Sequence, residues 1–224
     1  MKKRISVPLL FLLVGSMLSA TNCGNKEQIR KDIVRITRDI EAKKPVYGKY
    51  IKLKDPRTGM DVMCPMDCSG FVLTVYKFAN ISFFEEQKGK IEEKNGVKFI
   101  YKALKNAKKI YRIKIPNAAD IVFFNNTWDS NYNGKVNDEL THVGIVLFVD
   151  ENGTITFIHS SRKEGVNRDC VNLYHPEKEK LCGVTINSKI RPRENTDPPD
   201  TKYLAGELFN AFGTVFDVPQ EGDD

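Results

Sequence analysis

The stretch Asp67–Cys68–Ser69–Gly70–Phe71–Val72 predicts the start of an amphipathic helix that carries a reactive cysteine. Apolar residues continue at helical spacing as far as Ala79, and Asp67 is a favourable N-cap, so the helix should begin directly after it. Cys68 then lies in the first turn, where free backbone N–H groups and the helix dipole favour negative charge. Such a position lowers the pKa of a thiol and favours the thiolate nucleophile. The alternative is a buried, inert cysteine on an ordinary helix.

The first 22 residues have the composition of a secretory signal. A basic start, Lys2 to Arg4, precedes an apolar run from Val7 to Leu18 that is too short and too early to span a membrane. We therefore expect residues 1–22 to be a signal peptide and the protein to be exported.

The cysteine directly after this segment indicates a possible lipid anchor. Cys23 is followed by Gly24 and Asn25, as at a bacterial lipoprotein processing site. Acylation of Cys23 would tether the protein to a membrane, in the periplasm or at the cell surface. The alternative is plain secretion, with cleavage near Ala20 and a free Cys23.

The charge balance of the mature chain is only mildly basic. Removal of residues 1–22 takes away three positive charges and no acids, so the formal net charge falls from +6 to +3. This excess suits an anionic wall or membrane surface and does not argue for nucleic acid. The remaining chain of about 200 residues can bury one core. We expect an N-terminal helical lead at 23–44, one domain at 45–216 and an acidic tail at 217–224.

The other cysteines offer a disulfide or a metal site. Cys170 and Cys182 could close a local disulfide around a polar loop, which an exported protein permits and which leaves Cys64 without a partner. Zinc could instead use the four cysteines of the mature domain with His175. Their spacings lack the paired short knuckles of a zinc site, so we discount zinc.

Hydrophobic periodicity predicts helices in the first half of the chain and strands in the second. The predicted helices are 26–44, the Cys68 helix, 97–109 and 203–212, and residues 47–65 are expected to be irregular. The predicted strands are 120–124, 143–149, 154–159 and 184–190. Helices first and antiparallel strands later indicate an α+β domain.

Two of the three histidines are placed to assist a thiol nucleophile. His142 begins one predicted strand and His159 ends the next, and the turn between these strands suits a hairpin. Adjacent antiparallel strands could bring the two imidazoles together on one face. His142 would then act as base and acid for Cys68, and His159 would fix the tautomer of His142.

These features together resemble the NlpC-type papain-like cysteine peptidases of bacterial cell walls. Four motifs carry the resemblance, in family order: Asp67-Cys68-Ser69-Gly70-Phe71-Val72, Asp120-Ile121-Val122-Phe123-Phe124, His142-Val143-Gly144-Ile145-Val146 and Phe157-Ile158-His159-Ser160-Ser161. The resemblance implies a papain-like fold in which the cysteine helix packs on a small antiparallel sheet. It also implies that Cys68 is the nucleophile, His142 the base and His159 the third, polar member.

The resemblance further implies a substrate. Family members commonly hydrolyse peptide bonds in peptidoglycan stems, often between D-γ-glutamyl and a diamino acid. Asp67 and Ser69 would contact the free amine of the stem peptide, and Tyr47 would correspond to the upstream active-site tyrosine of the family. No cofactor is required for this chemistry.

The polar loop before His142 resembles a calcium-binding loop. Oxygen-bearing side chains stand at alternate positions, followed by a glycine, a backbone carbonyl and a later acid. The candidate ligands are Asp129, Asn131, Asn133, the carbonyl of Lys135, and Asp138. A structural calcium ion here would order the segment that presents His142. The alternative is an ordinary polar surface loop with Asn-Gly turn chemistry.

Other functions fit parts of the same pattern. A CHAP-like amidase also uses a cysteine and then a histidine on a papain-like fold, but cuts the sugar–peptide link. A transacylase could use the same pair. A catalytically silent lipoprotein that binds the cell wall would need neither the cysteine nor the histidine for its function.

Overall fold

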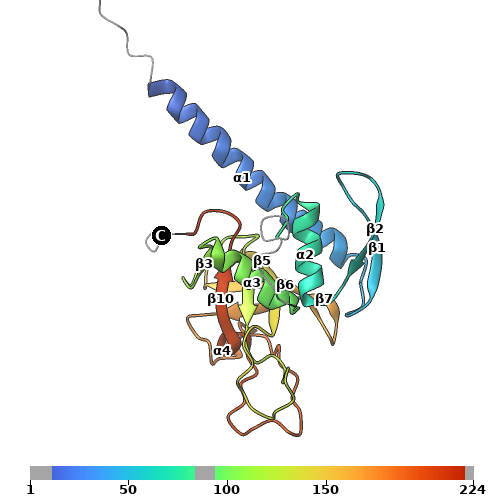
Figure 1. Ribbon diagram of the computed structural model, residues 1–224. Coiled ribbons are helices and arrows are strands. Elements are labelled where there is room, and N and C mark those ends of the chain that lie inside the picture. Colours follow the sequence, from blue (N-terminus) through green and yellow to red (C-terminus); the bar gives the residue numbers. More distant parts are fainter. Residues whose placement is uncertain (1–11, 84–93, 220–224) are drawn as a thin grey trace, which may run out of the picture.

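The computed structural model describes residues 12–83 and 94–219, and the side chains from Gly24 onward within these ranges. The elements in chain order are α1 (Leu12–Glu41), β1 (Tyr50–Lys54), β2 (Asp61–Pro65), α2 (Cys68–Phe78), α3 (Gly96–Asn106), β3 (Ile110–Tyr111), β4 (Ile121–Phe124), β5 (His142–Val149), β6 (Thr154–Ser161), β7 (Gly165–Asn172), β8 (Lys180–Leu181), β9 (Val184–Thr185), α4 (Ala205–Leu208) and β10 (Phe209–Gly213) (Figure 1). Residues 1–11 of the predicted signal, the side chain of Cys23 and residues 220–224 of the predicted tail lie outside the described part.

The described chain is organised around a six-stranded antiparallel sheet in the order β3-β10-β4-β5-β6-β7. Two small hairpins, β1-β2 and β8-β9, stand beside it. In the sequence, helices α1, α2 and α3 come before every strand of this six-stranded sheet. These three helices and the antiparallel sheet therefore occupy separate parts of the chain, and the predicted α+β class is confirmed.

Both faces of the sheet are buried. Along β4, Ile121 and Phe123 enter one hydrophobic cluster, while Val122 and Phe124 enter another. The alternation follows from the two-residue period of a strand. The first cluster includes the apolar sides of α1, α2 and α3, and the second includes Leu208 of α4.

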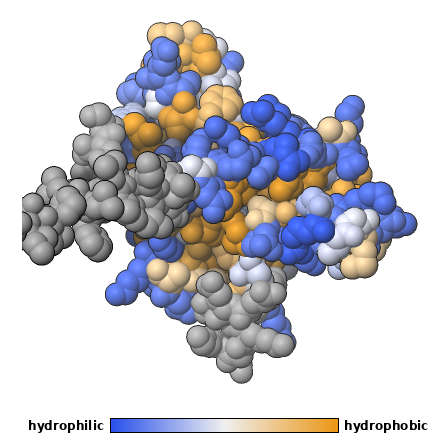
Figure 2. Space-filling model, turned by 90° about the horizontal axis from the view of Figure 1, so that it is seen from above, coloured by the Kyte–Doolittle hydropathy of each residue, from blue (hydrophilic) through white to orange (hydrophobic). Residues whose placement is uncertain are grey.

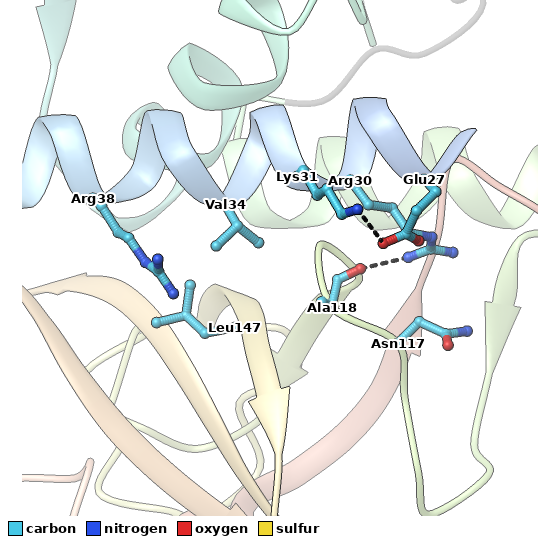
Figure 3. A pocket seen from close by; sticks show the side chains of 8 residues that line it. All are labelled: Glu27, Arg30, Lys31, Val34, Arg38, Asn117, Ala118 and Leu147. Carbon is cyan, nitrogen blue, oxygen red and sulfur yellow. Dashed lines mark hydrogen bonds and ion pairs between the residues drawn. The ribbon is translucent and has the colours of Figure 1, made fainter. Parts of the chain in front are cut away.

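Helix α1 is joined to the domain by a buried charge as well as by packing. Its residues Ile33 and Ile40 are buried in the first cluster. Arg30 donates to the Ala118 carbonyl at 2.5 Å and lies 3.0 Å from the carboxylate of Asp120, whose side chain is fully buried. Figure 3 shows the Arg30 guanidinium crossing from the helix to the Ala118 loop. Because a buried carboxylate needs a compensating charge, this pair fixes where the helix lies.

Helix α2 begins where the sequence predicts. Asp67 has extended backbone angles, and its side chain accepts the N–H groups of Ser69 and Gly70. A Cβ on Gly70 would lie 2.6 Å from the carbonyl oxygen of Pro65, so only glycine lets the end of β2 approach this turn. Asn80, just beyond the helix, has the positive φ of a stop residue.

Several parts of the chain differ from the expected elements. Helix α1 spans Leu12–Glu41 instead of 26–44, and the short strands β3 and β8 were not predicted. The hairpin β1-β2 lies within residues 47–65, which were predicted to be irregular, and β7 was not predicted. The predicted strand 184–190 is reduced to β9, and the predicted helix 203–212 divides into α4 and β10. In the last case pairing with β3 and β4 replaces helical hydrogen bonds, because residues 209–213 fill the gap between those strands. Among the described residues, no helix has the length and apolar character needed to cross a bilayer.

Candidate active site

The candidate nucleophile lies at the start of α2, as the sequence predicts. Cys68 is the first residue of the helix, and its side chain is buried, with 7% of the residue exposed. Oδ1 of Asp67 accepts the Ser69 hydroxyl at 2.7 Å in addition to the two backbone N–H groups. Asp67 and Ser69 therefore hold the first turn rigidly around the thiol.

The sulfur lies against the beginning of β5. It accepts a hydrogen bond from the backbone N–H of Val143, the residue that follows His142. Helix α2 packs on β5, which carries the helix start to the end of that strand. The Cys68 sulfur therefore faces the backbone of the residue that directly follows the predicted base.

Burial reverses the expected effect of the helix start on the thiol. Burial raises the pKa of Cys68 to about 12, and the negative charge of Asp67 adds to the rise. The backbone N–H groups of Ser69, Val143 and Cys68 itself lower the pKa, but by less. The expected low pKa is therefore wrong for the free site, because the sequence does not reveal how completely the thiol is enclosed.

The two predicted histidines meet. His142 Nε2 and His159 Nδ1 are 2.5 Å apart, and the rings are almost perpendicular, at 88°. They come from the adjacent strands β5 and β6, as expected. Gly144 makes this approach possible, since a Cβ there would lie 3.0 Å from the Ile158 carbonyl oxygen and 3.3 Å from the Cβ of His159.

A carboxylate completes the line of polar groups. His159 Nε2 lies 2.9 Å from Oδ2 of Asp169 on β7. Burial alone would raise the pKa of Asp169, but hydrogen bonds from His159, Ser188 and Asn167 outweigh burial and lower it, so the group is ionised. Sequence reasoning missed Asp169 because β7 was not predicted. The signal was the turn at Lys163 and Glu164, which makes residues 165–172 a partner for β6.

The hydrogen bonds define the protonation of the imidazole pair when both rings are neutral. His159 Nε2–H donates to Asp169, so His159 Nδ1 accepts the Nε2–H of His142. His142 Nδ1 is then the ring nitrogen without a proton. Burial, together with the neighbouring charge of His159, lowers the pKa of His142 well below its usual value. The free site therefore holds a neutral thiol and a neutral His142 imidazole.

The rim of the site is formed by Tyr47, Arg162 and Trp128. The pKa of Tyr47 is raised by burial and by its closeness to Cys68 and Asp67, while a hydrogen bond from Arg162 opposes the rise. The Arg162 guanidinium also lies over the Trp128 ring, 4.7 Å from its centroid. Tyr47 is thus brought to the nucleophile, as the sequence resemblance implies, whereas Arg162 and Trp128 were not predicted.

The predicted disulfide is not formed. Cys170 and Cys182 are both free, and so is Cys64. The thiol of Cys170 on β7 is engaged by the Thr185 carbonyl and the Ser188 hydroxyl, whereas Cys182 is exposed at the turn between β8 and β9. The prediction is therefore wrong: closeness in sequence did not bring the two thiols together. In the part of the chain that is described, no three His, Cys, Asp or Glu side chains gather as a metal site.

Two hollows elsewhere on the surface contain none of these groups. One, of about 560 Å³, lies under α1 around Arg30, Arg38 and Leu147 (Figure 3). The other is a groove of about 1150 Å³ between α1, α2, α3 and the C-terminal segment. Figure 2 shows apolar side chains gathered between polar ones on the face seen from above.

A cysteine at a helix start, set against an antiparallel sheet that carries a histidine pair, is the arrangement of a papain-like α+β cysteine hydrolase. The chain belongs to the NlpC/P60 family, whose profile matches residues 52–185, more than half of its 224 residues. Members of this family are cell-wall cysteine peptidases and amidases that act on peptidoglycan. No curated protein and no solved structure gives a match to the chain.

Proposed function

We propose that the protein is an exported cysteine endopeptidase that cleaves peptidoglycan stem peptides between D-γ-glutamyl and a diamino acid. The observation that carries the proposal is the line His142–His159–Asp169, which begins at the residue before Val143, whose backbone N–H faces the Cys68 sulfur at the start of α2. Cys68 is the proposed nucleophile and His142 the base. His159 and Asp169 position the base and stabilise its charged form.

The reaction follows from the neutral starting state. As the Cys68 sulfur attacks the scissile carbonyl carbon, its proton passes to His142 Nδ1, and the charge created on the ring is shared with His159 and Asp169. Backbone N–H groups at the start of α2 stabilise the oxyanion. His142 then protonates the departing amine, leaving a thioester on Cys68. Water, deprotonated by His142, hydrolyses the thioester and restores the thiol.

The groups on the rim complement the charges of such a substrate. Asp67 and Tyr47, both close to Cys68, suit the free amine of a stem peptide. The guanidinium of Arg162 suits the free carboxylate that a γ-linked glutamyl residue retains. Ser69 supports this arrangement through its hydrogen bond to Asp67.

Digestion of purified peptidoglycan by the wild type and by Cys68→Ala tests the proposal. We expect muropeptide fragments from the wild type and none from the variant. Cys170→Ala, which removes a free thiol from β7, is the matched control and should digest as the wild type does. Equal release by the wild type and Cys68→Ala would refute the assignment.

Mass spectrometry of the same digest separates the alternatives. A CHAP-like amidase would release intact stem peptides from the sugar strands, whereas the proposed endopeptidase leaves a shortened stem on the sugar. Sedimentation with peptidoglycan without any fragment release would indicate a cell-wall-binding lipoprotein instead.

We also propose that Cys23 carries a lipid that tethers the enzyme to a membrane. The support is the order of basic start, apolar run and cysteine in residues 1–23. Metabolic labelling with an alkyne fatty acid should mark the wild type and not Cys23→Ala. Equal labelling of both would exclude Cys23 as the attachment site.

A further inference from the structure

In the loop between β4 and β5, backbone N–H groups of one short turn hold several side-chain oxygens in place. Oδ1 and Oδ2 of Asp129 accept the backbone N–H groups of Asn133 and Gly134, and the Asn131 and Asn133 amide oxygens accept N–H groups within the same turn. Gly134 has φ +70°, a conformation that favours glycine. Each of these oxygens keeps a second lone pair, so the hydrogen bonds position them without exhausting them.

Asp138, at the end of the same loop, has a carboxylate oxygen with no partner. The residue is only 4% exposed, and Oδ2 is a buried atom without a hydrogen bond. The other oxygen, Oδ1, accepts the hydroxyl of Ser130, the residue after Asp129, which turns the carboxylate toward that segment. A buried carboxylate oxygen left unpaired is costly, so its surroundings call for a cation.

The backbone around Asp138 is fixed. Its N–H donates to the Asn126 side chain, and its carbonyl accepts the N–H of Asn126. Both backbone groups of Asp138 are therefore held to the start of the loop, and the side chain begins from a buried position.

We propose that this loop binds a calcium ion. The ligands are the side-chain oxygens of Asp129, Asn131, Asn133 and Asp138 and the backbone carbonyl of Lys135. A mixture of carboxylate, amide and backbone oxygens is the set that Ca²⁺ prefers, and two carboxylates balance its charge. Only two of the five proposed ligands are carboxylates. The loop therefore differs from the clusters of three or more His, Cys, Asp or Glu side chains that are absent from the described residues.

The ion would act on the rim of the active site. Trp128 directly precedes Asp129, packs edge-on against Tyr132 with ring centroids 6.3 Å apart, and carries the Arg162 guanidinium. Arg162 in turn hydrogen-bonds Tyr47 beside the nucleophile. At the other end the loop leads into His142. Calcium would therefore order both the rim and the strand that carries the base.

The chain contains one tryptophan, Trp128, and this gives a direct test on the full-length protein. Terbium, a luminescent stand-in for calcium, should emit when Trp128 is excited, and added Ca²⁺ should quench that emission by displacement. We expect Asp138→Asn and Asp129→Asn each to weaken terbium binding at least tenfold. Both changes preserve shape, and thermal melts of the metal-free variants would confirm that they fold.

Asp150→Asn is the matched control. Asp150 is also a turn carboxylate that accepts backbone N–H groups, but it lies in the turn between β5 and β6. This variant should bind terbium as the wild type does. Absence of sensitised emission from the wild type, or equal binding by Asp138→Asn, would overturn the proposal. Repeating the titration with Cys68→Ala separates metal binding from the proposed peptidase activity, since the calcium site does not require the thiol.

Discussion

Asp169→Asn tests whether the carboxylate on β7 supports the imidazole pair. The amide keeps the size of the side chain and can still accept the Nε2–H of His159, but it carries no charge. A hydrogen bond to an ionised group contributes about 1.5–3 kcal/mol and one to a neutral group about 0.5–1.5 kcal/mol. The loss is therefore about 1–2 kcal/mol, felt when His142 becomes charged. The rate should fall about 5- to 30-fold.

The same change should alter the pH dependence of the rate. Removal of the negative charge disfavours the protonated imidazole pair and lowers its apparent pKa. The acidic limb of the activity profile, where the base becomes protonated, should move to lower pH. A purely structural role for Asp169 would lower the rate without moving this limb.

The assay is the initial rate of fragment release from peptidoglycan between pH 5 and 9, at matched concentrations of folded enzyme. Asp39→Asn, which neutralises an exposed carboxylate on α1, is the control and should match the wild type. The reasoning is refuted if Asp169→Asn changes neither the rate of fragment release nor the position of the acidic limb of the pH profile. It is also refuted if the loss equals that of Cys68→Ala, because a positioning group cannot be as important as the nucleophile.

Three further outcomes follow from the structure. The rate of Cys68 alkylation by iodoacetamide should still increase with pH above pH 8, because burial raises the pKa of the thiol. Asp67→Asn should shift this pH–rate curve to lower pH, since it removes a negative charge while keeping the helix cap. A wild-type rate that is already constant below pH 7 would contradict this expectation. Gly144→Ala should lower the free energy of unfolding by about 1–3 kcal/mol, because the added Cβ would be too close to atoms of strand β6. An unchanged urea midpoint would show that β6 moves enough to accommodate the Cβ. Arg30→Met should cost about 3–5 kcal/mol, because it removes the cation beside the buried carboxylate of Asp120, which then keeps, among the described residues, only the hydrogen bonds from Tyr111 and Asn117. Adding Asp120→Asn should recover much of that loss, whereas a cost below about 1 kcal/mol would show that water reaches Asp120.

The parts of the fold that were predicted correctly have strong local signals. Asp67 is a favourable cap followed by an apolar helical stripe, and the cores of β4, β5 and β6 are runs of Val, Ile and Phe. The meeting of His142 with His159 also followed from local order, because a short turn forces consecutive strands to pair. Sequence reasoning therefore supplied the principal side chains of the candidate site.

The parts that were missed depend on distant partners. Residues 209–213 are apolar enough for either a helix or a strand, and the neighbouring strands β3 and β4 decide in favour of a strand. Asp169 looks like one polar residue among many until β7 is paired with β6. The pKa of Cys68 depends on enclosure by several elements, which no window of sequence reports.

The position of β10 has a consequence for how the domain must assemble. This strand comes from residues 209–213, yet it lies between β3 and β4, which precede it by about 85 to 100 residues of chain. A polypeptide that emerges N-terminus first would leave one edge of β4 open until residues 209–213 are available. A fragment trimmed to the matched range 52–185 would keep Cys68, both histidines and Asp169, but would have a gap inside its sheet. Proteolytic removal of the C-terminal segment should therefore inactivate the enzyme without touching a catalytic group.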